Sequence, residues 1–391
     1  MTLQQNKDRI QTTHIGSLPR PHDLLDLMKA KFNNKSYDRK NYDAILTKAV
    51  ADAVRKQAEC GIDIVTDGEF SKPGFFTYIQ ERLEGFEARP DQKVKLFQQE
   101  VAAFPEYYAQ YFKEAMMGGA IVPLAPVVCI GPVKYRGEKF VKIDIENVKA
   151  AAKAVGISDH HVFLPATSPS GVGINEYYKT DEEYFNALAG ELSKEYKAIV
   201  DAGILVQIDD PFLADIFSEP DLDAAQKKRR ARIYVEAVNA ALKGIPAEKV
   251  RFHTCYGINE GPRLYEAALA DVIEYVLQIN SGSFSFEAAN PRHEHEYHLF
   301  ERVKVPDGKV LCPGVITHAS NIVEHPELIA ERIIRFARLV GRENVMAGAD
   351  CGFSSQALYK TEVHHTVVWE KFKALRQGAD LATEQLWGKA S

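Results

Sequence analysis

A histidine and a cysteine two positions apart, His253 and Cys255, are the pair in this sequence best placed to bind one metal ion. They close the short apolar run VRFHTC, which is typical of a β-strand. In a strand, residues two apart point to the same side, so the imidazole and the thiol can converge. The pair is weak evidence on its own, because a free cysteine is usually a small buried hydrophobic residue.

Two further candidate ligands close other β-branched runs of the sequence. Glu287 ends SFSFE, and Cys351 ends VMAGADC. With His253 and Cys255 they form a nitrogen, sulfur, oxygen and sulfur set, which zinc favours over magnesium or calcium. The sequence therefore predicts a zinc site, although Glu287 could instead be an ion-pair partner and the cysteines could be structural.

The predicted ligands indicate which reaction such a zinc centre would support. Two thiolates, a carboxylate and a neutral imidazole give the centre a net negative charge, which makes it a poor activator of water. It can still hold a substrate thiol as the thiolate, whereas a free thiol, with a pKa of about 8.5, is mostly protonated at pH 7. A substrate sulfur would displace the carboxylate most readily. We therefore expect transfer of an alkyl group, in particular a methyl group, to a thiol.

The elements that must position these residues are eight short β-rich runs that alternate with amphipathic segments. The runs cover residues 9–17, 62–69, 161–167, 204–209, 250–255, 283–287, 310–317 and 345–351, and the clearest helical segments cover 42–59, 181–202, 224–242, 264–277 and 326–340. Alternating strands and helices predict a parallel sheet. Eight units fit a single (β/α)8 TIM-type barrel, with the site at the carboxyl ends of the strands. We expect one domain, 1–391, with a β-hairpin insertion at 121–143 after the second strand.

Composition and charge exclude several classes of protein. The 391 residues are 46% hydrophobic and 26% charged, with a net charge of −6. No run of like charge indicates a nucleic-acid surface, and no stretch approaches the ~18 apolar residues that a membrane span needs. Five cysteines in a chain of this length do not resemble a disulfide framework. We expect a cytoplasmic protein that binds neither nucleic acid nor membranes.

Five motifs together resemble a known family. HTC, FE and DCG, with THIGSLPRP near the start and QIDDP in mid-chain, are similar to the catalytic barrel of cobalamin-independent methionine synthase. The resemblance runs from about residue 8 to residue 355. FEAANPRHEHE and GVITHASNIVEHPE look closer to the short single-barrel relatives, which include epoxyalkane:coenzyme M transferases. The resemblance implies a zinc enzyme that acts on a thiol.

The resemblance also implies a site for the amino acid part of homocysteine. The family motifs fall on Ile15, Gly16 and Ser17, on Glu69 and on Asp209. Two carboxylates can bind an ammonium group, while backbone N–H groups and a hydroxyl can bind a carboxylate. If both carboxylates face the pocket, they favour homocysteine over coenzyme M, whose far end is an anionic sulfonate. Alternatively, Glu69 and Asp209 form ion pairs at the barrel rim.

The family's acid histidine and its folate-stacking tryptophan match less closely. In the family this histidine lies in the motif D-I-H-S. The corresponding sequence here is Thr317-His318-Ala319-Ser320, in which the histidine is offset by about one residue. His318 is therefore a candidate proton donor to the leaving group, or else a rim histidine. Neither tryptophan of the chain lies before the end of the last predicted strand. The methyl donor could be a folate, a corrinoid protein or another molecule.

Four functions remain to be distinguished at this point. The first is methylation of homocysteine to methionine by a zinc enzyme. The second is alkylation of another thiol, or opening of an epoxide, by the same zinc chemistry. The third is a metal-free decarboxylase that resembles uroporphyrinogen decarboxylase, and the fourth is a binding protein with a structural zinc. Metal analysis and thiol binding separate them. A homo-oligomer is a further expectation, because many soluble proteins form one.

Overall fold

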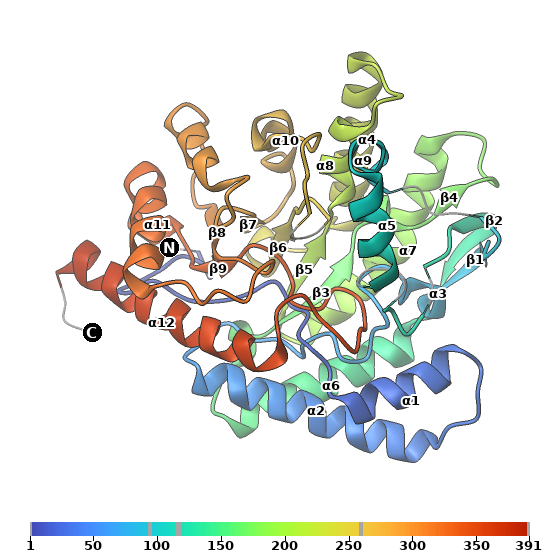
Figure 1. Cartoon of the computed structure of the whole chain (residues 1–391), viewed down its shortest axis with the longest axis horizontal. Helices are drawn as coiled ribbons and strands as arrows, with labels where there is room; N and C mark the ends of the chain where they lie inside the picture. Colours follow the sequence, from blue (N-terminus) through green and yellow to red (C-terminus); the bar gives the residue numbers. More distant parts are fainter. Residues whose placement is uncertain (1, 93–95, 115–118, 123, 258–260, 389–391) are drawn as a thin grey trace.

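The core of the protein is a parallel sheet of six strands that curls around a buried interior (Figure 1). The computed structural model describes residues 2–92, 96–114, 119–122, 124–257 and 261–388. The strands follow the order β3-β5-β6-β7-β8-β9. Their bounds are β3 (Phe163–Thr167), β5 (Leu205–Asp209), β6 (Val250–His253), β7 (Ser283–Phe286), β8 (Val310–Ile316) and β9 (Gly348–Ala349). Each coincides with one of the predicted runs.

Two N-terminal segments lie between the outer strands of this sheet. Both come from the predicted runs 9–17 and 62–69, but they contribute isolated bridges instead of full strands. The bridges are all parallel: Thr12 with Ala347, Thr13 with Ile64, and Val65 with Val162. The N–H of Thr13 donates to the carbonyl of Ala347 at 2.9 Å, and that of Phe163 donates to Val65 at 3.0 Å. The segments therefore connect the neighbourhood of β3 with that of β9.

A polar contact inside the curled sheet fixes the first of these segments. The guanidinium of Arg251, on β6, donates to the hydroxyl of Thr13 at 2.9 Å and to the carbonyl of His14 at 3.0 Å. It also donates to Gln207 on β5 at 3.2 Å. A buried guanidinium is tolerated only when its donors have acceptors, so these bonds tie the segment to the sheet at one register. Residues 15–17 then emerge at the carboxyl end of the sheet.

Helices lie around the outside of the sheet (Figure 1). The α-helices of this layer are α1 (His22–Phe32), α2 (Arg39–Glu59), α6 (Glu138–Ala154), α7 (Asp181–Asp201), α8 (Phe212–Ser218), α9 (Ala224–Ala241), α10 (Leu269–Val276), α11 (Pro326–Val340) and α12 (His365–Trp387). Short 3-10 helices are η1 (Asp159–His161), η2 (Pro169–Gly171), η3 (Ala247–Lys249), η4 (Glu294–Glu301) and η5 (Arg342–Asn344). Four predicted helices are confirmed to within three residues. The fifth, 264–277, starts only at Leu269.

The late start of α10 has a local cause. The preceding residues Arg263 and Glu266 form ion pairs, and the side chains of Leu264 and Tyr265 face solvent. This alternation of buried charge and exposed apolar groups does not suit an amphipathic helix. The side chain of Asp271 then accepts from the N–H of Ala268, which closes the first turn of α10.

The predicted hairpin at 121–143 is wrong. Among the described residues of this range the structure has one strand, β2 (Val127–Tyr135), and its antiparallel partner is β1 (Leu83–Ala88). Residues from Glu138 onward begin α6, where Val141, Asp144 and Val148 recur at helical spacing on the buried face. The run VKYRGEKFVKI, predicted as the second strand of the hairpin, is therefore divided between the end of β2 and the start of α6. β4 (Ile174–Asn175) adds a short parallel pairing to β2.

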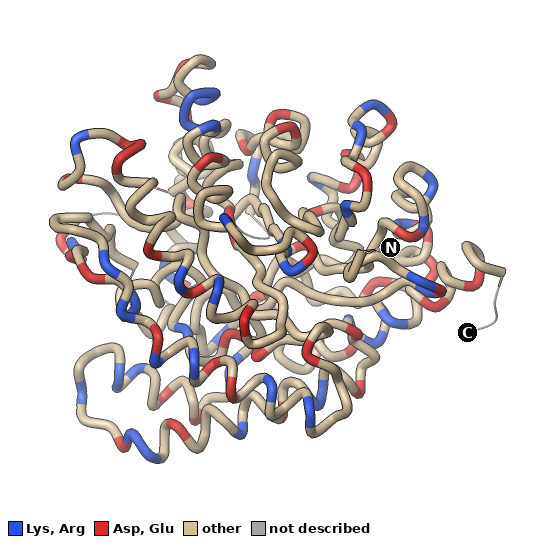
Figure 2. Tube along the Cα trace, turned by 180° about the vertical axis from the view of Figure 1, so that it is seen from behind, with Lys and Arg blue, Asp and Glu red and all other residues tan. Residues whose placement is uncertain are grey.

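The described part of the insertion around β1 and β2 also contains three helices. They are α3 (Ile79–Arg82), α4 (Gln98–Ala103) and α5 (Pro105–Glu114). A buried ion pair between Arg82 and Asp144 joins α3 to α6. Acidic and basic residues are interspersed along the trace seen from behind (Figure 2). Among the described residues, no helix is both long enough and apolar enough to cross a membrane.

Candidate metal centre

Three buried side chains from two distant parts of the chain meet at the carboxyl end of the sheet. His253 is the last residue of β6, Cys255 lies two residues further on, and Cys351 follows β9. One ligand atom from each lies within 4.8 Å of the other two, and the Sγ of Cys351 is 3.6 Å from the Nε2 of His253. These are the donor types and the separation expected of a site that could hold a metal ion.

Regular sheet hydrogen bonds explain why the three side chains converge. β6 and β7 pair in parallel up to His253 and Ser285, and the N–H of Thr254 donates to the carbonyl of Ser285 at 3.0 Å. The ladder therefore continues past β6, and Cys255 points to the same side as His253. On the opposite side, the N–H of Asp350 donates to the carbonyl of Ile316 at 3.0 Å, which fixes the position of Cys351.

Burial controls the protonation of these three groups. It lowers the pKa of His253 to about 3, with help from the nearby His318 and Arg251, so the imidazole is neutral at pH 7. Nδ1 lies 3.3 Å from the hydroxyl of Ser285, which leaves Nε2 to face the thiol. A hydrogen bond with Cys255, burial and the charge of Glu287 raise the pKa of Cys351 well above its usual value. A cation among these groups would reverse that effect.

Glu287, the fourth predicted ligand, does not belong to this group of three. It is 1% exposed, and its carboxylate falls in a second cluster with His318 and Asp350. The side-chain amide of Asn290 donates to its Oε2 at 2.8 Å, and Arg292 donates to the same oxygen at 3.3 Å. Glu287 is nevertheless close enough for its charge to act on Cys351.

His318, the predicted proton donor, follows β8 and faces the same cavity. Burial lowers its pKa to about 4, although the charge of Asp350 opposes this shift. Among the described residues, neither ring nitrogen of His318 has a hydrogen-bond partner. The imidazole is therefore neutral at pH 7 and can accept a proton as well as return one.

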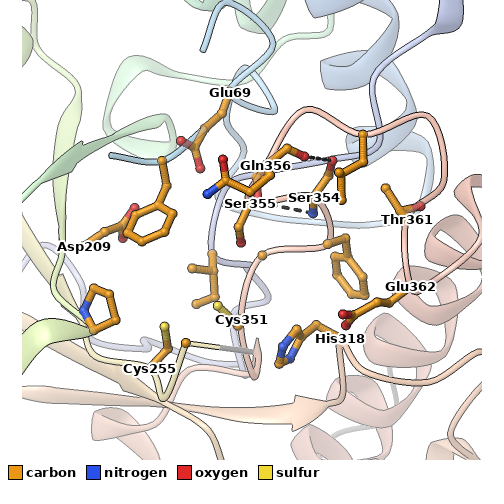
Figure 3. A pocket seen from close by; sticks show the side chains of 18 of the residues that line it. Glu69, Asp209, Cys255, His318, Cys351, Ser354, Ser355, Gln356, Thr361 and Glu362 are labelled. Atoms are coloured by element: carbon orange, nitrogen blue, oxygen red, sulfur yellow. Dashed lines mark hydrogen bonds between the residues drawn. The ribbon is translucent and has the colours of Figure 1, made fainter. Parts of the chain in front are cut away.

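His253, Cys255 and Cys351 line the part of a cavity that we call its floor, and the cavity measures about 930 Å³ out to the open solvent. The two cysteines are labelled in Figure 3. Of the residues singled out in the sequence, eight line the cavity: Ile15, Ser17, Glu69, Asp209, His253, Cys255, His318 and Cys351. Gly16 and Glu287 do not. The structure thus gathers residues from most of the length of the chain around one space.

Gly16 does not line the cavity but lies against Glu69, which does; we call the part of the lining formed by Glu69 and Asp209 the wall. Its φ is +140°, and a Cβ there would lie 2.6 Å from the ring of Pro165 and 2.9 Å from a carboxylate oxygen of Glu69. Any side chain at position 16 would push Glu69 aside. The glycine of the predicted motif therefore acts by allowing the carboxylate to approach the backbone.

Glu69 and Asp209 present two carboxylates to the cavity, and each has partners of its own (Figure 3). A buried ion pair of 3.2 Å joins Glu69 to Lys72. The amide of Gln207 donates to Asp209 at 2.9 Å and also to the carbonyl of Ile15 at 2.5 Å. Burial, followed by the charge of Glu69, raises the pKa of Asp209 well above its usual value. Lys72 contacts Glu69 and not Asp209, and the charges of Lys72 and Arg251 only partly oppose the shift of Asp209, so a further cationic group would be stabilised beside these carboxylates.

Several lining residues had not been anticipated from the sequence. Most belong to the segment after β9, where Ser354, Ser355, Gln356, Thr361 and Glu362 line the cavity (Figure 3). The sequence signal for them is the polar run FSSQ, which directly follows DCG at the end of the last predicted strand. Two aromatic residues, Phe75 and Tyr111, had no such signal, since they come from outside the eight predicted units.

A family model decides the relationship of this chain to known proteins. The model described as the catalytic domain of cobalamin-independent synthase matches residues 10–135 and 158–368. The chain belongs to the cobalamin-independent methionine synthase family. The family resemblance expected from HTC, FE and DCG is thereby confirmed, and the chain is related to methyltransferase enzymes.

Individual relatives extend over nearly the whole chain. The methionine synthase of Thermococcus kodakarensis is 25% identical over 383 residues, which cover 96% of this chain and 94% of that protein. That of Sulfolobus acidocaldarius is 28% identical over 351 residues, 88% of this chain and 85% of its own. The 5-methyltetrahydropteroyltriglutamate–homocysteine methyltransferase of Thermotoga petrophila is 23% identical, and the match covers 90% of this chain but 44% of that longer protein.

Solved structures show that the fold is shared. A B12-independent methionine synthase from Shewanella sp. W3-18-1, in complex with selenomethionine, superposes with a TM-score of 0.72 at 19% identity. The match covers 97% of this chain and 100% of that one. A putative vitamin-B12 independent methionine synthase from Listeria monocytogenes gives 0.66 at 21% identity, over 96% and 99% of the two chains.

Proposed function

We propose that this protein is a zinc-dependent methionine synthase that transfers a methyl group to the sulfur of homocysteine. The observation that carries the proposal is one cavity with a His253–Cys255–Cys351 floor and a wall that presents Glu69 and Asp209. The imidazole and the two thiols of the floor suit a zinc ion that can bind a substrate thiol. The two carboxylates of the wall suit an ammonium group. Full-length relatives named methionine synthase support the same activity.

We further infer that the curled sheet and the two bridging segments make up a complete (β/α)8 barrel, and that residues 1–391 form one domain. The parallel bridges at Thr12, Thr13 and Val65 support this inference, because they connect both outer ends of the sheet. A barrel of this kind carries its active site at the carboxyl ends of its strands, which is where the cavity lies.

His253, Cys255 and Cys351 would hold zinc, with Glu287 as a fourth, replaceable ligand. The fit rests on the donor set: a neutral imidazole and two thiols, all buried and within 4.8 Å of one another. Bound zinc supplies a positive charge that keeps a thiol deprotonated at neutral pH.

The wall of the cavity would bind the amino acid part of homocysteine. Glu69 and Asp209 would take the ammonium group, and the segment Ile15–Gly16–Ser17 would take the carboxylate through the hydroxyl of Ser17. An ammonium between the two carboxylates would offset their mutual repulsion, which contributes to the raised pKa of Asp209. A thiol with a sulfonate at its far end, such as coenzyme M, would instead bring a third negative charge to the same wall.

His318 would handle the proton that the leaving group of the methyl donor requires. Its neutral imidazole faces the cavity without a competing partner among the described residues, so it can take up a proton and pass it on. The donor itself would be a methylated folate or the methyl group of a corrinoid protein. An assay with both donors distinguishes them.

The decisive experiment combines metal analysis with thiol binding. We expect the purified protein to retain close to one zinc per chain, to bind homocysteine at least tenfold more tightly than coenzyme M, and to form methionine with one of the two donors. A matched control is Cys60→Ser, because Cys60 is buried, does not line the cavity, and contacts the backbone of α12 instead. Absence of zinc, or equal binding of both thiols, would refute the proposal.

A further inference from the structure

The carboxylate of Glu287 has a set of partners that lies outside the group of three metal-binding candidates. Asn290 and Arg292, which follow it in the turn after β7, donate to its Oε2 at 2.8 Å and 3.3 Å. The N–H of Tyr256 donates to its Oε1 at 3.4 Å. A fully buried carboxylate is strongly unfavourable without such partners, so these contacts determine where it can lie.

The turn that carries these donors is itself fixed to the sheet. The Oδ1 of Asp350 accepts hydrogen bonds of 2.8 Å from the N–H groups of Ala288 and Ala289. Its Oδ2 accepts one of 3.0 Å from Asn290, whose amide thus bridges Asp350 and Glu287. Asn290 therefore cannot follow Glu287 if that side chain changes its position.

Arg292 is held just as firmly, by Glu266. Its Nη1 lies 2.8 Å from both carboxylate oxygens of Glu266. Glu266 is anchored in turn by His293, 3.2 Å away, whose ring stacks on Tyr256 with centroids 4.1 Å apart. The guanidinium is thus oriented by contacts that do not involve Glu287. In the ion pair between Arg292 and Glu287, the glutamate is therefore the side chain that can change its position.

We propose that Asn290 and Arg292 form a resting position for Glu287, which receives its carboxylate when a substrate thiol takes the fourth ligand position. This inference rests on the proposed function, because it assumes a metal ion held by His253, Cys255 and Cys351. In the exchange one anionic ligand replaces another, and the proton of the thiol is released to solvent. Because the displaced carboxylate keeps two buried donors, the exchange leaves no unpaired charge behind.

The proposal makes Arg292 a positioning residue that sets the balance between Glu287 and the thiol. Without its guanidinium, Glu287 would favour the metal ion over the resting position. We therefore expect Arg292→Met to raise the affinity for zinc about tenfold in the absence of thiol. The same substitution should weaken the binding of homocysteine to the cobalt-substituted protein about tenfold, as followed by the cobalt absorption bands.

A double-mutant cycle with Glu287→Gln isolates the interaction. In the Glu287→Gln background, Arg292→Met should change both affinities less than twofold, because a neutral amide has little to gain from the guanidinium. Arg335→Met is a matched control, since Arg335 pairs with Glu294 at the adjacent 3-10 helix and not with Glu287. Zinc affinity is measured by competition with a chromophoric chelator.

Two outcomes would overturn the proposal. Arg292→Met could leave zinc affinity unchanged, or it could weaken homocysteine binding equally in both backgrounds, which would mean that Arg292 acts on the substrate or on the fold. If Arg292→Met does not fold, Asn290→Ala tests the same position, with the same directions of change and about threefold effects expected. Failure of the proposed function is distinct: the wild-type protein would then bind no zinc at all.

Discussion

Two clusters of three potential metal ligands lie side by side at the top of the sheet, and they differ in how their groups are partnered. Both are fully buried, and in both the ligand atoms lie within 4.8 Å of one another. In the first, His253, Cys255 and Cys351 contact mainly one another and Ser285. In the second, the carboxylates of Glu287 and Asp350 accept hydrogen bonds from neighbouring donors.

Residue type and burial therefore do not by themselves identify a metal site. What distinguishes the first cluster is the small number of protein donors that compete for its lone pairs. In the second cluster, Ala288, Ala289 and Asn290 donate hydrogen bonds to the carboxylates. These bonds connect the end of β7 to the end of β9. We therefore propose the first cluster as the metal centre and the second as its support, from which Glu287 would reach the metal ion as the fourth ligand.

The largest effect is expected from Cys351→Ser in the first cluster. Loss of one thiolate from a three-residue set should lower zinc content from about one per chain to below one tenth and abolish methyl transfer. Zinc is measured by atomic emission on the dialysed protein. Full retention of zinc would show that the first cluster is not the metal centre.

Asp350→Ala in the second cluster should lower stability without removing the metal. It leaves the N–H groups of Ala288 and Ala289 buried without their acceptor, which costs about 3 kcal/mol of unfolding free energy. Denaturant unfolding of the zinc-loaded protein measures this loss. A variant of normal stability that has lost its zinc would reverse the roles given to the two clusters.

His318 is the member of the second cluster that has no hydrogen-bond partner among the described residues, so it should behave unlike its neighbours. We expect His318→Asn to lower kcat about a hundredfold, as for loss of a general acid, and to leave zinc content and stability nearly unchanged. Steady-state kinetics with saturating homocysteine provides the test. A loss of stability comparable to that of Asp350→Ala would make His318 a structural residue.

The smallest effect concerns the charges that surround the second cluster. Burial by itself would lower the pKa of His293, but hydrogen bonds with Glu266 and Glu296 raise it to about 9. Because the folded-state pKa lies above the unfolded value of about 6.5, this ion pair stabilises the protein fully below pH 6.5. The contribution is lost as the pH rises through 9.

We expect this loss to amount to about 2 kcal/mol between pH 6.5 and pH 9, because Glu266 also pairs with Arg292 and the imidazolium supplies only part of its compensation. His293→Gln should be less stable than the wild type at pH 6.5 and similar to it above pH 9. Thermal unfolding at both pH values measures the difference. A gap that stays constant with pH would mean that His293 is neutral in the folded protein.

The sequence predicted which residues end the strands better than it predicted the contacts made in the turns that follow them. His253, Cys255 and Cys351 could be found because each lies at the end of a short β-branched run, and parallel strands end at one edge of the sheet. The position of Glu287 could not be found in this way. Its direction depends on Asn290 and Arg292 in the turn that follows, and strand periodicity carries no information about turn contacts.

The architecture of the insertion differs from the predicted hairpin for a related reason. β1 and β2 lie about 40 residues apart in sequence, and the described residues between them include α4 and α5, so the two strands are not neighbours across a short hairpin turn. Tyr111, on α5, reaches the cavity and its hydroxyl lies 2.6 Å from Glu362, a contact over 251 residues of sequence. Such pairs depend on tertiary packing, which a single sequence does not reveal.

The hydroxyl of Ser17 accepts from the N–H of Ser354 at 3.4 Å, although the two residues are 337 positions apart. During synthesis on a ribosome, the amino-terminal segment must therefore wait until almost the entire polypeptide has emerged before it reaches its final neighbours. Contacts of such long range slow folding and leave early intermediates with unpaired strand edges. A nascent chain stopped before residue 345 would then lack more than its last helix. The cavity would also lack its lining residues after β9, and Ser17 would lack its contact with Ser354.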